Sequence, residues 1–571
     1  MRKARLHWLG AAAVCGLLAA AHTWPLAAHP AIHSRNDTAD AQLNEWIVMW
    51  VAHQLPRNPA RLFDANIFYP AHDVLAFSEP LIVPGAMAVP IAALGASPVL
   101  TYNLVLLAGL ALTALAGYRL ILAWTGDHAA AMLAGSMFAF NTHTITRLPH
   151  MQGLHLYGLP LALLAADRLI VHARTRDALW LAVWMAVLVG TSGYTAVFGI
   201  FMVAAVIVSR VPEWWGRRAA PVLGRFLLAS IVCGVAVIPV YLPYQRVADE
   251  QGMVRSLDSV HLYSATLNHY LSSAGRLHQA WSAPFFEKAG DAYFPGVIVL
   301  VLAAFAVGCA IRRRRRAPIE EPPHDDQTAD ALTRARIRTL LAIAVVGVVL
   351  SLGTNTPLYG WLFEIFPPIR GMRAASRFGM LFMLAAACLA GYGLWFLRES
   401  GWAAFRGRRS AAAAAALILV ANLETLAAPI PFHPFTGIPA IYARLADEPG
   451  NVVLVEIPLY RRSQISNNAE YVLASTMHWR KLVNGYSGYV SQEYRNYAES
   501  FRGFPADSSL AAMRGAGVTH VMVHPARFPA NAAAVMGELA VHPAFELVAE
   551  GPDGMRLYRL KTPTMSRPEA D

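Results

Sequence analysis

The chain has 571 residues, of which 56% are hydrophobic and only 15% are charged, and its formal net charge is +11. A soluble protein usually has about a quarter of its residues charged, so this composition argues against an ordinary soluble enzyme and favours lipid as the main solvent. The positive charge does not indicate nucleic-acid binding, because the arginines gather in short segments beside apolar stretches, as in the run Arg312–Arg316. That is the positive-inside pattern of membrane proteins.

Apolar stretches recur along the chain, and each approaches the ~20 residues with which a helix crosses a bilayer. Basic residues precede the first stretch, which predicts an uncleaved first helix with a cytoplasmic N-terminus. The apolar segment Pro80–Gly95 is short and rich in proline, so we expect it to be re-entrant or interfacial. We predict a polytopic α-helical membrane protein of about 11 spans, at residues 8–28, 98–124, 128–141, 154–171, 178–192, 194–208, 222–244, 296–311, 338–353, 377–397 and 410–428.

This topology divides the chain into four regions. Residues 1–311 form a transmembrane module whose first loop, 29–97, is external, and residues 312–337 form a basic, proline-containing cytoplasmic linker that we expect to be flexible. Residues 338–428 carry the C-terminal transmembrane helices. The last region, 429–571, falls outside the membrane on the same side as the first loop.

The C-terminal region has a different pattern from the rest of the chain. "NVVLVEIPL" (451–459) and "GVTHVMVHP" (517–525) are short, β-branched and bounded by Gly or Pro, which is typical of buried strands. "SSLAAMRGAG" predicts a helix with a glycine stop, and "FELVAEG" with "MRLYRL" predicts a final hairpin. We therefore expect a small α/β domain.

Acidic residues stand close to membrane depth in the first external loop. A helix is predicted from about Thr38, with tryptophans in the headgroup layer and the carboxylate of Asp40 towards water. Asp64 and Glu79 follow in an aromatic segment. Acids at this depth cost free energy unless they face a water-filled cavity. An amphipathic connecting helix whose acids are simply solvated would explain the same residues.

At this point the sequence resembles the GT-C superfamily of integral-membrane glycosyltransferases. "DAQLNEW" (40–46) resembles the acidic first-loop motif of that superfamily. Further segments resemble uncharacterised bacterial members in the same order: "LFDANIFYP", "RLPHMQGLHLYGLPLALLAADRL", "PPIRGMRAASRFGMLF" and "HWRKLVNGYSGY". The resemblance covers most of the chain.

The resemblance implies transfer of a sugar, with inversion, from a polyprenyl-phosphate carrier. A carboxylate removes the proton of the acceptor hydroxyl during attack on the anomeric carbon, and cations stabilise the phosphate that leaves. Asp40 is the expected base, Asp37 remains a rival, and Glu79 has a supporting role. Among the loop residues, His53 and Asp64 are further candidates for contact with the substrate.

Two segments beside predicted span ends offer groups for the phosphate and the sugar. Arg370, Arg373 and Arg377 run against the positive-inside trend, and the last two, four residues apart, would share a helical face. Snorkelling arginines or pairing with Glu364 would explain them equally well. The loop "TRLPHMQGLH" adds four polar candidates, for which a structural role is equally open: Arg147, His150, Gln152 and His155.

In the C-terminal region, "WRKLVNGYSGYVSQEYRNY" combines aromatic rings with amides, a common composition of sugar-binding sites. Trp479, Asn484 and Tyr486 are the candidates for the acceptor site, although a turn-rich core segment would have the same composition. None of the four cysteines forms a CxxC pair, and no external HExxH or DxD occurs, so the presence of a divalent cation stays open.

We therefore predict a glycosyltransferase (hexosyl or pentosyl) of the bacterial inner membrane with its C-terminal domain in the periplasm. Its partners would be membrane lipid, a polyprenyl-phosphate-linked sugar and a glycan, lipid or protein acceptor of the cell envelope, and no nucleic acid. A transporter or flippase of lipid-linked glycans is one alternative, although few charged residues lie mid-span. A non-enzymatic envelope assembly protein is another.

Overall fold

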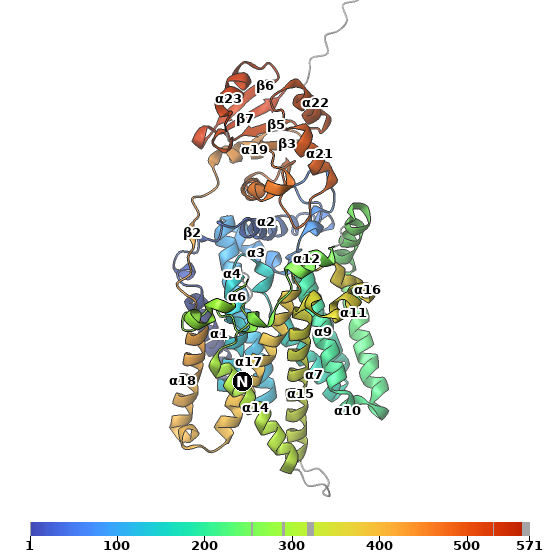
Figure 1. Ribbon diagram of the computed structural model, residues 1–571, viewed down its shortest axis with the longest axis vertical. Helices are drawn as coiled ribbons and strands as arrows, with labels where there is room; N and C mark the ends of the chain where they lie inside the picture. The colour runs from blue at the N-terminus through green and yellow to red at the C-terminus, as the bar shows by residue number, and fades with distance from the viewer. Residues whose placement is uncertain (1, 253–254, 288–291, 317–324, 529, 562–571) are drawn as a thin grey trace, which may run out of the picture.

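The computed structural model describes residues 2–252, 255–287, 292–316, 325–528 and 530–561. The long helices labelled in Figure 1 run roughly along the long axis of the molecule, and each of the eleven predicted apolar stretches overlaps a helix. These helices are α1 (Arg2–His22), α4 (Pro98–Thr125), α5 (His128–Ala139), α7 (Gly158–His172), α8 (Thr175–Thr191), α9 (Gly193–Ser209), α11 (Ala219–Gln251), α14 (Val297–Arg316), α15 (Asp325–Ser351), α17 (Gly379–Glu399) and α18 (Gly407–Thr425).

Three helical segments among the described residues are long and apolar enough to cross a membrane: Pro98–Thr125, Gly216–Gln251 and Ala375–Glu399. Together with the fold they identify a membrane protein; crossing by the remaining helices stays a prediction. The segment expected to be re-entrant contains the short apolar helix α3 (Ile82–Ala93). The charged linker is helical at both ends, because α14 continues to Arg316 and α15 begins at Asp325; its centre, 317–324, lies outside the described residues.

Glycine allows the helices of the bundle to approach closely. A Cβ on Gly135 of α5 would lie 2.3 Å from the carbonyl oxygen of Ala114 on α4. A Cβ on Gly393 of α17 would lie 2.1 Å from the carbonyl oxygen of Leu302 on α14. Because helices in lipid associate through close packing rather than through the hydrophobic effect, these two contacts hold the centre of the bundle together.

A buried ion cluster closes the end of the bundle that lies away from the C-terminal domain. Asp167 accepts hydrogen bonds from Arg210 at 2.6 Å and from Arg336 at 2.9 Å, and it joins α7, the end of α9 and α15. Trp124 of α4 donates a further bond to the same carboxylate at 2.9 Å. Since every charge here has an opposite partner, the cluster fixes the helix ends rather than lining a transport path.

The loop between α1 and α4, predicted to be external, contains α2 (Ala39–Gln54), which lies across the top of the bundle (Figure 1). The expectation that its tryptophans sit in the headgroup layer is wrong. Trp46 and Trp50 are buried, and their indole nitrogens donate to the side chain of Asn66 at 3.3 Å and to the carbonyl of Leu62 at 2.8 Å. The C-terminal region packs on α2 from above, so this helix is an interior layer of the molecule.

The C-terminal region contains a five-stranded sheet of order β4-β3-β5-β7-β6. β3 is parallel to both β4 and β5, and the hairpin β6–β7 joins β5 antiparallel. The strands are β3 (Val453–Ile457), β4 (Lys481–Leu482), β5 (His520–Val523), β6 (Phe545–Glu550) and β7 (Arg556–Leu560), and the helices around them are α19 (Ala443–Asp447), α20 (Ala469–Ala474), α21 (Gln492–Ser500), α22 (Asp507–Gly515) and α23 (Ala532–Val541).

Backbone hydrogen bonds attach this sheet to the loop between α1 and α4. The amides of Phe68 and Tyr69 donate to the carbonyls of Asn484 and Leu482, at 3.2 and 3.0 Å, and the amide of Leu482 donates to the carbonyl of Asn66 at 2.7 Å. A second connection is the antiparallel pair of β1 (His33–Ser34) and β2 (His433–Pro434). The remaining short helices are α6 (Thr142–Thr146), α10 (Val211–Trp214), α12 (Leu257–Leu262), α13 (Gln279–Ser282) and α16 (Pro357–Ile365).

Candidate active site

Asp40 stands in the first turn of α2, and its position follows from the local sequence. Thr38 is the N-cap residue, and its hydroxyl accepts a hydrogen bond from the amide of Ala41 at 3.3 Å. A carboxylate in the first helical turn is stabilised by the positive end of the helix dipole. The sequence around Asp40 therefore fixes both the start of the helix and an ionised acid beside it.

Two side chains from distant parts of the chain hold the carboxylate of Asp40. The hydroxyl of Tyr486 donates to Oδ1 at 2.7 Å, and Nε2 of His150 lies 3.3 Å from Oδ2. The hydrogen bond from His150 is the main cause that lowers the pKa of Asp40 to about 2; burial opposes it, and Tyr486 and the charge of Arg373 add to it. About half of the Asp40 side chain stays exposed, so the ionised carboxylate is both oriented and accessible.

His150 faces Asp40 as a neutral imidazole at neutral pH. Burial lowers its pKa, against the favourable effect of the Asp40 carboxylate, and the positive charges of Arg377 and Arg147 lower it further. A neutral imidazole has one N–H, and the carboxylate fixes that proton on Nε2. His150 is therefore a hydrogen-bond donor that orients the acid.

The two arginines expected to share a helical face do not lie on a common α-helix. Arg373 precedes the 3₁₀ turn Ala375–Phe378, and Arg377 lies within it. The Arg373 guanidinium lies 4.5 Å from the ring of Tyr263, and that of Arg377 lies 4.6 Å from the ring of Tyr194. The Tyr194 hydroxyl accepts from the amide of Arg373 at 3.0 Å, so this tyrosine positions both residues.

Glu79 lies at the far side of the same group. Its Oε2 accepts a hydrogen bond from the amide of Gly193 at 2.9 Å. Burial raises its pKa, while a hydrogen bond from Ser192 and the charges of Arg377 and Arg255 oppose that rise. Glu79 thus lies within the electrostatic reach of Arg377 and Arg255, but its Oε2 is bound by the start of α9.

A small hollow lies between His150 and Arg377. Its volume is about 30 Å³, close to that of one water molecule, and its lining includes Arg147, His150, Gln152, Tyr194 and Arg377. The loop between α6 and α7 therefore meets the segment before α17, and three of the four polar residues predicted in that loop reach the site. His155 does not, because it is buried in the bundle with Nε2 3.2 Å from the carbonyl of Val105.

Three other predicted residues lie away from Asp40. Asp37 is exposed and pairs with Arg35 at 3.2 Å and with His433 at 3.7 Å. Asp64 is exposed and accepts from the amide of Asp73 at 3.3 Å. Arg370 donates to the carbonyls of Phe363 and Glu364, 2.7 Å away in both cases, and so closes its own loop.

Of the three candidates in the C-terminal region, one contacts Asp40 and two do not. Tyr486 reaches Asp40, whereas Asn484 is buried and bridges the backbone of Glu456, accepting at 2.7 Å and donating at 2.8 Å. Trp479 stacks on His53 with ring centroids 4.4 Å apart, at the opposite end of α2. His53, Trp479 and Asn484 therefore hold the domain in place instead of joining the site around Asp40.

Sequence reasoning missed Tyr194, Tyr263 and Arg255. Arg255 donates to the carbonyl of Gly488 at 2.8 Å, and burial together with the charge of Arg373 lowers its pKa. Tyr263 and Arg255 belong to the segment between α11 and α14, whose aromatic and polar composition was the available signal. Among the described residues no group of three or more His, Cys, Asp and Glu side chains has the arrangement of a metal site.

Comparison with known proteins supports the fold. No family model and no curated protein matches the chain. Among solved structures, the mycobacterial arabinofuranosyltransferase AftD matches 98% of this chain and 42% of its own, at 15% identity and a TM-score of 0.55. The chain therefore spans less than half the length of AftD.

Two further structures resemble the chain more loosely. The oligosaccharyltransferase AglB of Archaeoglobus fulgidus, in complex with an inhibitory peptide and a dolichol-phosphate, matches 98% of this chain and 75% of its own, at 14% identity and a TM-score of 0.44. ArnT of Cupriavidus metallidurans matches 90% and 93%, at 14% identity and a TM-score of 0.37. The chain has a GT-C-type fold, as the sequence resemblance predicted.

Proposed function

Given the GT-C fold, we propose that the chain is a membrane glycosyltransferase that moves a sugar from a polyprenyl-phosphate donor to an acceptor of the bacterial cell envelope. The observation that carries the proposal is one half-exposed, oriented carboxylate, Asp40, that feels the charge of Arg373 and lies beside His150, which lines the same small hollow as Arg377. An acid beside cations at the end of a span is what attack by a hydroxyl and departure of a lipid phosphate require.

Asp40 acts as the general base in this proposal. Its lowered pKa keeps it ionised near neutral pH, and Tyr486 and His150 leave its remaining lone pairs for the acceptor hydroxyl. A carboxylate of such low pKa is a weak base towards a free alcohol, but the hydroxyl becomes far more acidic as its oxygen bonds to the anomeric carbon. Proton transfer therefore accompanies bond formation rather than preceding it.

Arg373 and Arg377 bind the phosphate of the donor. In the part of the chain that the structure describes, their guanidinium groups lie over tyrosine rings, and neither forms a direct ion pair with a carboxylate. Cations held in this way keep their charge for a ligand, and the planar fork of arginine fits two phosphate oxygens. Arg147 and Arg255 add positive charge around them.

In this proposal, the end of the bundle that carries Asp40 lies at the outer face of the inner membrane, where the lipid-linked donor would meet it. The basic residues near α10 and the run Arg312–Arg316 at the end of α14 lie at the opposite end, which the positive-inside pattern assigns to the cytoplasm (Figure 1). The C-terminal domain would then be periplasmic, and an inverting transfer would take place between it and the lipid headgroups.

The test is sugar transfer by the full chain in lipid vesicles, with a panel of polyprenyl-phosphate hexoses and pentoses as donors and an envelope glycan extract as acceptor. Asp40→Asn is expected to lower kcat by at least about a hundredfold, the usual contribution of a general base. Asp64→Asn is the matched control, because Asp64 is an exposed carboxylate of the same loop that bonds to the amide of Asp73 and lies away from Asp40. Equal transfer by the wild type and Asp40→Asn would refute the proposal.

A further inference from the structure

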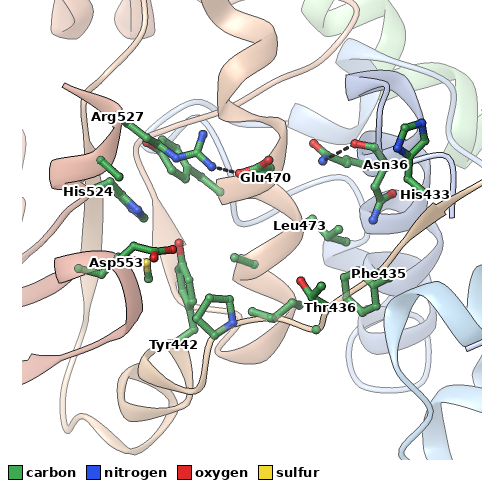
Figure 2. A pocket seen from close by; sticks show the side chains of 18 of the residues that line it. Asn36, His433, Phe435, Thr436, Tyr442, Glu470, Leu473, His524, Arg527 and Asp553 are labelled. Carbon is green, nitrogen blue, oxygen red and sulfur yellow. Dashed lines mark hydrogen bonds and ion pairs between the residues drawn. The ribbon is translucent and has the colours of Figure 1, made fainter. Parts of the chain in front are cut away.

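A second cavity, separate from the site around Asp40, lies beneath the C-terminal sheet. Its volume is about 470 Å³, within the range of roughly 300–1,000 Å³ that is typical of small-molecule sites. Three segments enclose it: the residues around the start of α2, the connecting segment 433–439, and the C-terminal domain (Figure 2). No residue predicted for the acceptor site from the "WRKLVNGYSGY" segment lines it.

Hydrogen bonds and ring contacts within the C-terminal region fix the side chains that line this face of the cavity. The carboxylate of Glu456, which is fully buried on β3, accepts from the hydroxyl of Tyr442 at 2.7 Å and lies 2.7 Å from Nε2 of His524. The ring of His524 stacks on Tyr471 with centroids 4.6 Å apart, and the Arg527 guanidinium lies 5.2 Å from the ring of Tyr471. Tyr442, His524 and Arg527 all line the cavity.

The charges of the lining argue against an anionic ligand. Among the lining residues are three carboxylates and a single arginine, and that arginine, Arg527, forms an ion pair with Glu470 (Figure 2). His433 faces Asp37, which also pairs with Arg35. Because no uncompensated cation remains in the lining, a phosphate or a carboxylate would meet net repulsion.

The remaining lining suits a ligand with many hydroxyls and some apolar surface. Phe435 and Tyr442 contribute aromatic surface, and Asn36, Gln42 and Thr436 contribute polar groups around the same hollow (Figure 2). Amides, hydroxyls and carboxylates accept and donate hydrogen bonds to hydroxyl groups, while an aromatic surface packs on the C–H face of a sugar ring. An uncharged carbohydrate has this combination of properties.

The cavity is adjacent to the proposed base but does not contain it. Gln42 is two residues from Asp40, and side chains two apart on a helix face different sides. We propose that the cavity binds an uncharged sugar unit of the acceptor, remote from the hydroxyl that reacts; this inference rests on the proposed function. The acceptor would then pass around the first turn of α2.

The experiment measures binding without transfer. The full chain in detergent is titrated with maltose, a mannose disaccharide and an arabinose disaccharide, each followed by saturation-transfer NMR, with glucose 6-phosphate as the anionic arm. Binding of at least one neutral sugar is expected, and it should be lost in Thr436→Trp, which fills the cavity from an exposed position. The matched control is Ser508→Trp, at an exposed position on α22 that does not line the cavity.

Two outcomes would overturn the inference: no binding of any neutral sugar, or binding that is unchanged in Thr436→Trp. Preferential binding of glucose 6-phosphate would also contradict it. Transfer assays separate the two proposals. Thr436→Trp should raise the acceptor KM about tenfold or more with little change in kcat, because it removes binding that is equally strong in the ground state and in the transition state. Sugar binding by a chain that lacks transfer would refute the proposed function alone, and transfer without sugar binding would refute the cavity alone.

Discussion

The hydroxyl of Tyr486 donates a 2.7 Å hydrogen bond to the carboxylate of Asp40, although the two residues are 446 positions apart in the chain. Tyr486 belongs to the C-terminal region, and Asp40 belongs to the loop between α1 and α4. The site is therefore completed only when that domain docks on α2. Each of the following predictions tests one part of this arrangement.

Tyr486→Phe should lower kcat/KM roughly tenfold, because a hydrogen bond to a charged group contributes about 1.5–3 kcal/mol and 1.4 kcal/mol corresponds to a factor of ten. The bond favours the ionised form of Asp40, so its loss should raise the pKa of this carboxyl from about 2 towards its usual value. The acid limb of the pH–rate profile should move to higher pH. An unchanged acid limb with unchanged kcat/KM would show that Tyr486 does not orient the base.

Arg377→Gln should reduce kcat by about a hundredfold, the usual effect of removing one group that stabilises the charge of a transition state. The matched control is Arg370→Gln, since the Arg370 side chain contacts its own loop: it donates to the carbonyls of Phe363 and Glu364 and pairs with the Glu364 carboxylate at 4.0 Å. Transfer from the lipid-phosphate donor is measured for both variants. Equal loss in the two variants would contradict a specific role of Arg377 at the phosphate.

Glu79→Gln should change how thermal stability depends on pH. Burial raises the pKa of Glu79 in the folded chain above its ordinary value of 4.5. The stability linked to its proton is thus present below pH 4.5 and is lost as the pH rises through the raised pKa. As the pH rises from 4.5 to the raised pKa, the Tm of the wild type should therefore fall relative to the Tm of Glu79→Gln. Parallel Tm curves for the two proteins would show that Glu79 titrates normally.

Gly485→Ala should weaken the docking of the C-terminal domain. A Cβ at this position would lie 2.5 Å from the ring of Phe68, which is fully buried, so either the ring or the loop that carries Tyr486 must move. Overpacking of this kind costs about 1–3 kcal/mol. Limited proteolysis of the intact chain should cut the variant faster between the two parts, and transfer should fall as well.

The control for this prediction is Gly503→Ala, because a Cβ at Gly503 would meet only the side chain of Ala506 at an ordinary distance of 3.9 Å. It should leave the proteolysis rate and transfer unchanged. A Gly485→Ala variant as resistant to proteolysis as the wild type would mean that the interface adapts to the added methyl group.

The sequence alone determined where the helices form and which acid stands at the start of α2. Long apolar stretches in lipid have no alternative to helix, because unpaired backbone amides and carbonyls are too costly there. The N-cap Thr38 and the acid Asp40 specify a helix start by local hydrogen bonding, which needs no distant partner. Local rules of this kind can be read from a few neighbouring residues.

Only the tertiary structure decided which side chains meet. His155 and His150 are five residues apart with similar surroundings in the sequence, yet one is buried in the bundle and the other faces Asp40. Likewise, Asn484 supports the sheet while Tyr486, two residues later, reaches the site. Such differences depend on the direction of each side chain when segments hundreds of residues apart pack together, and no local pattern encodes that direction.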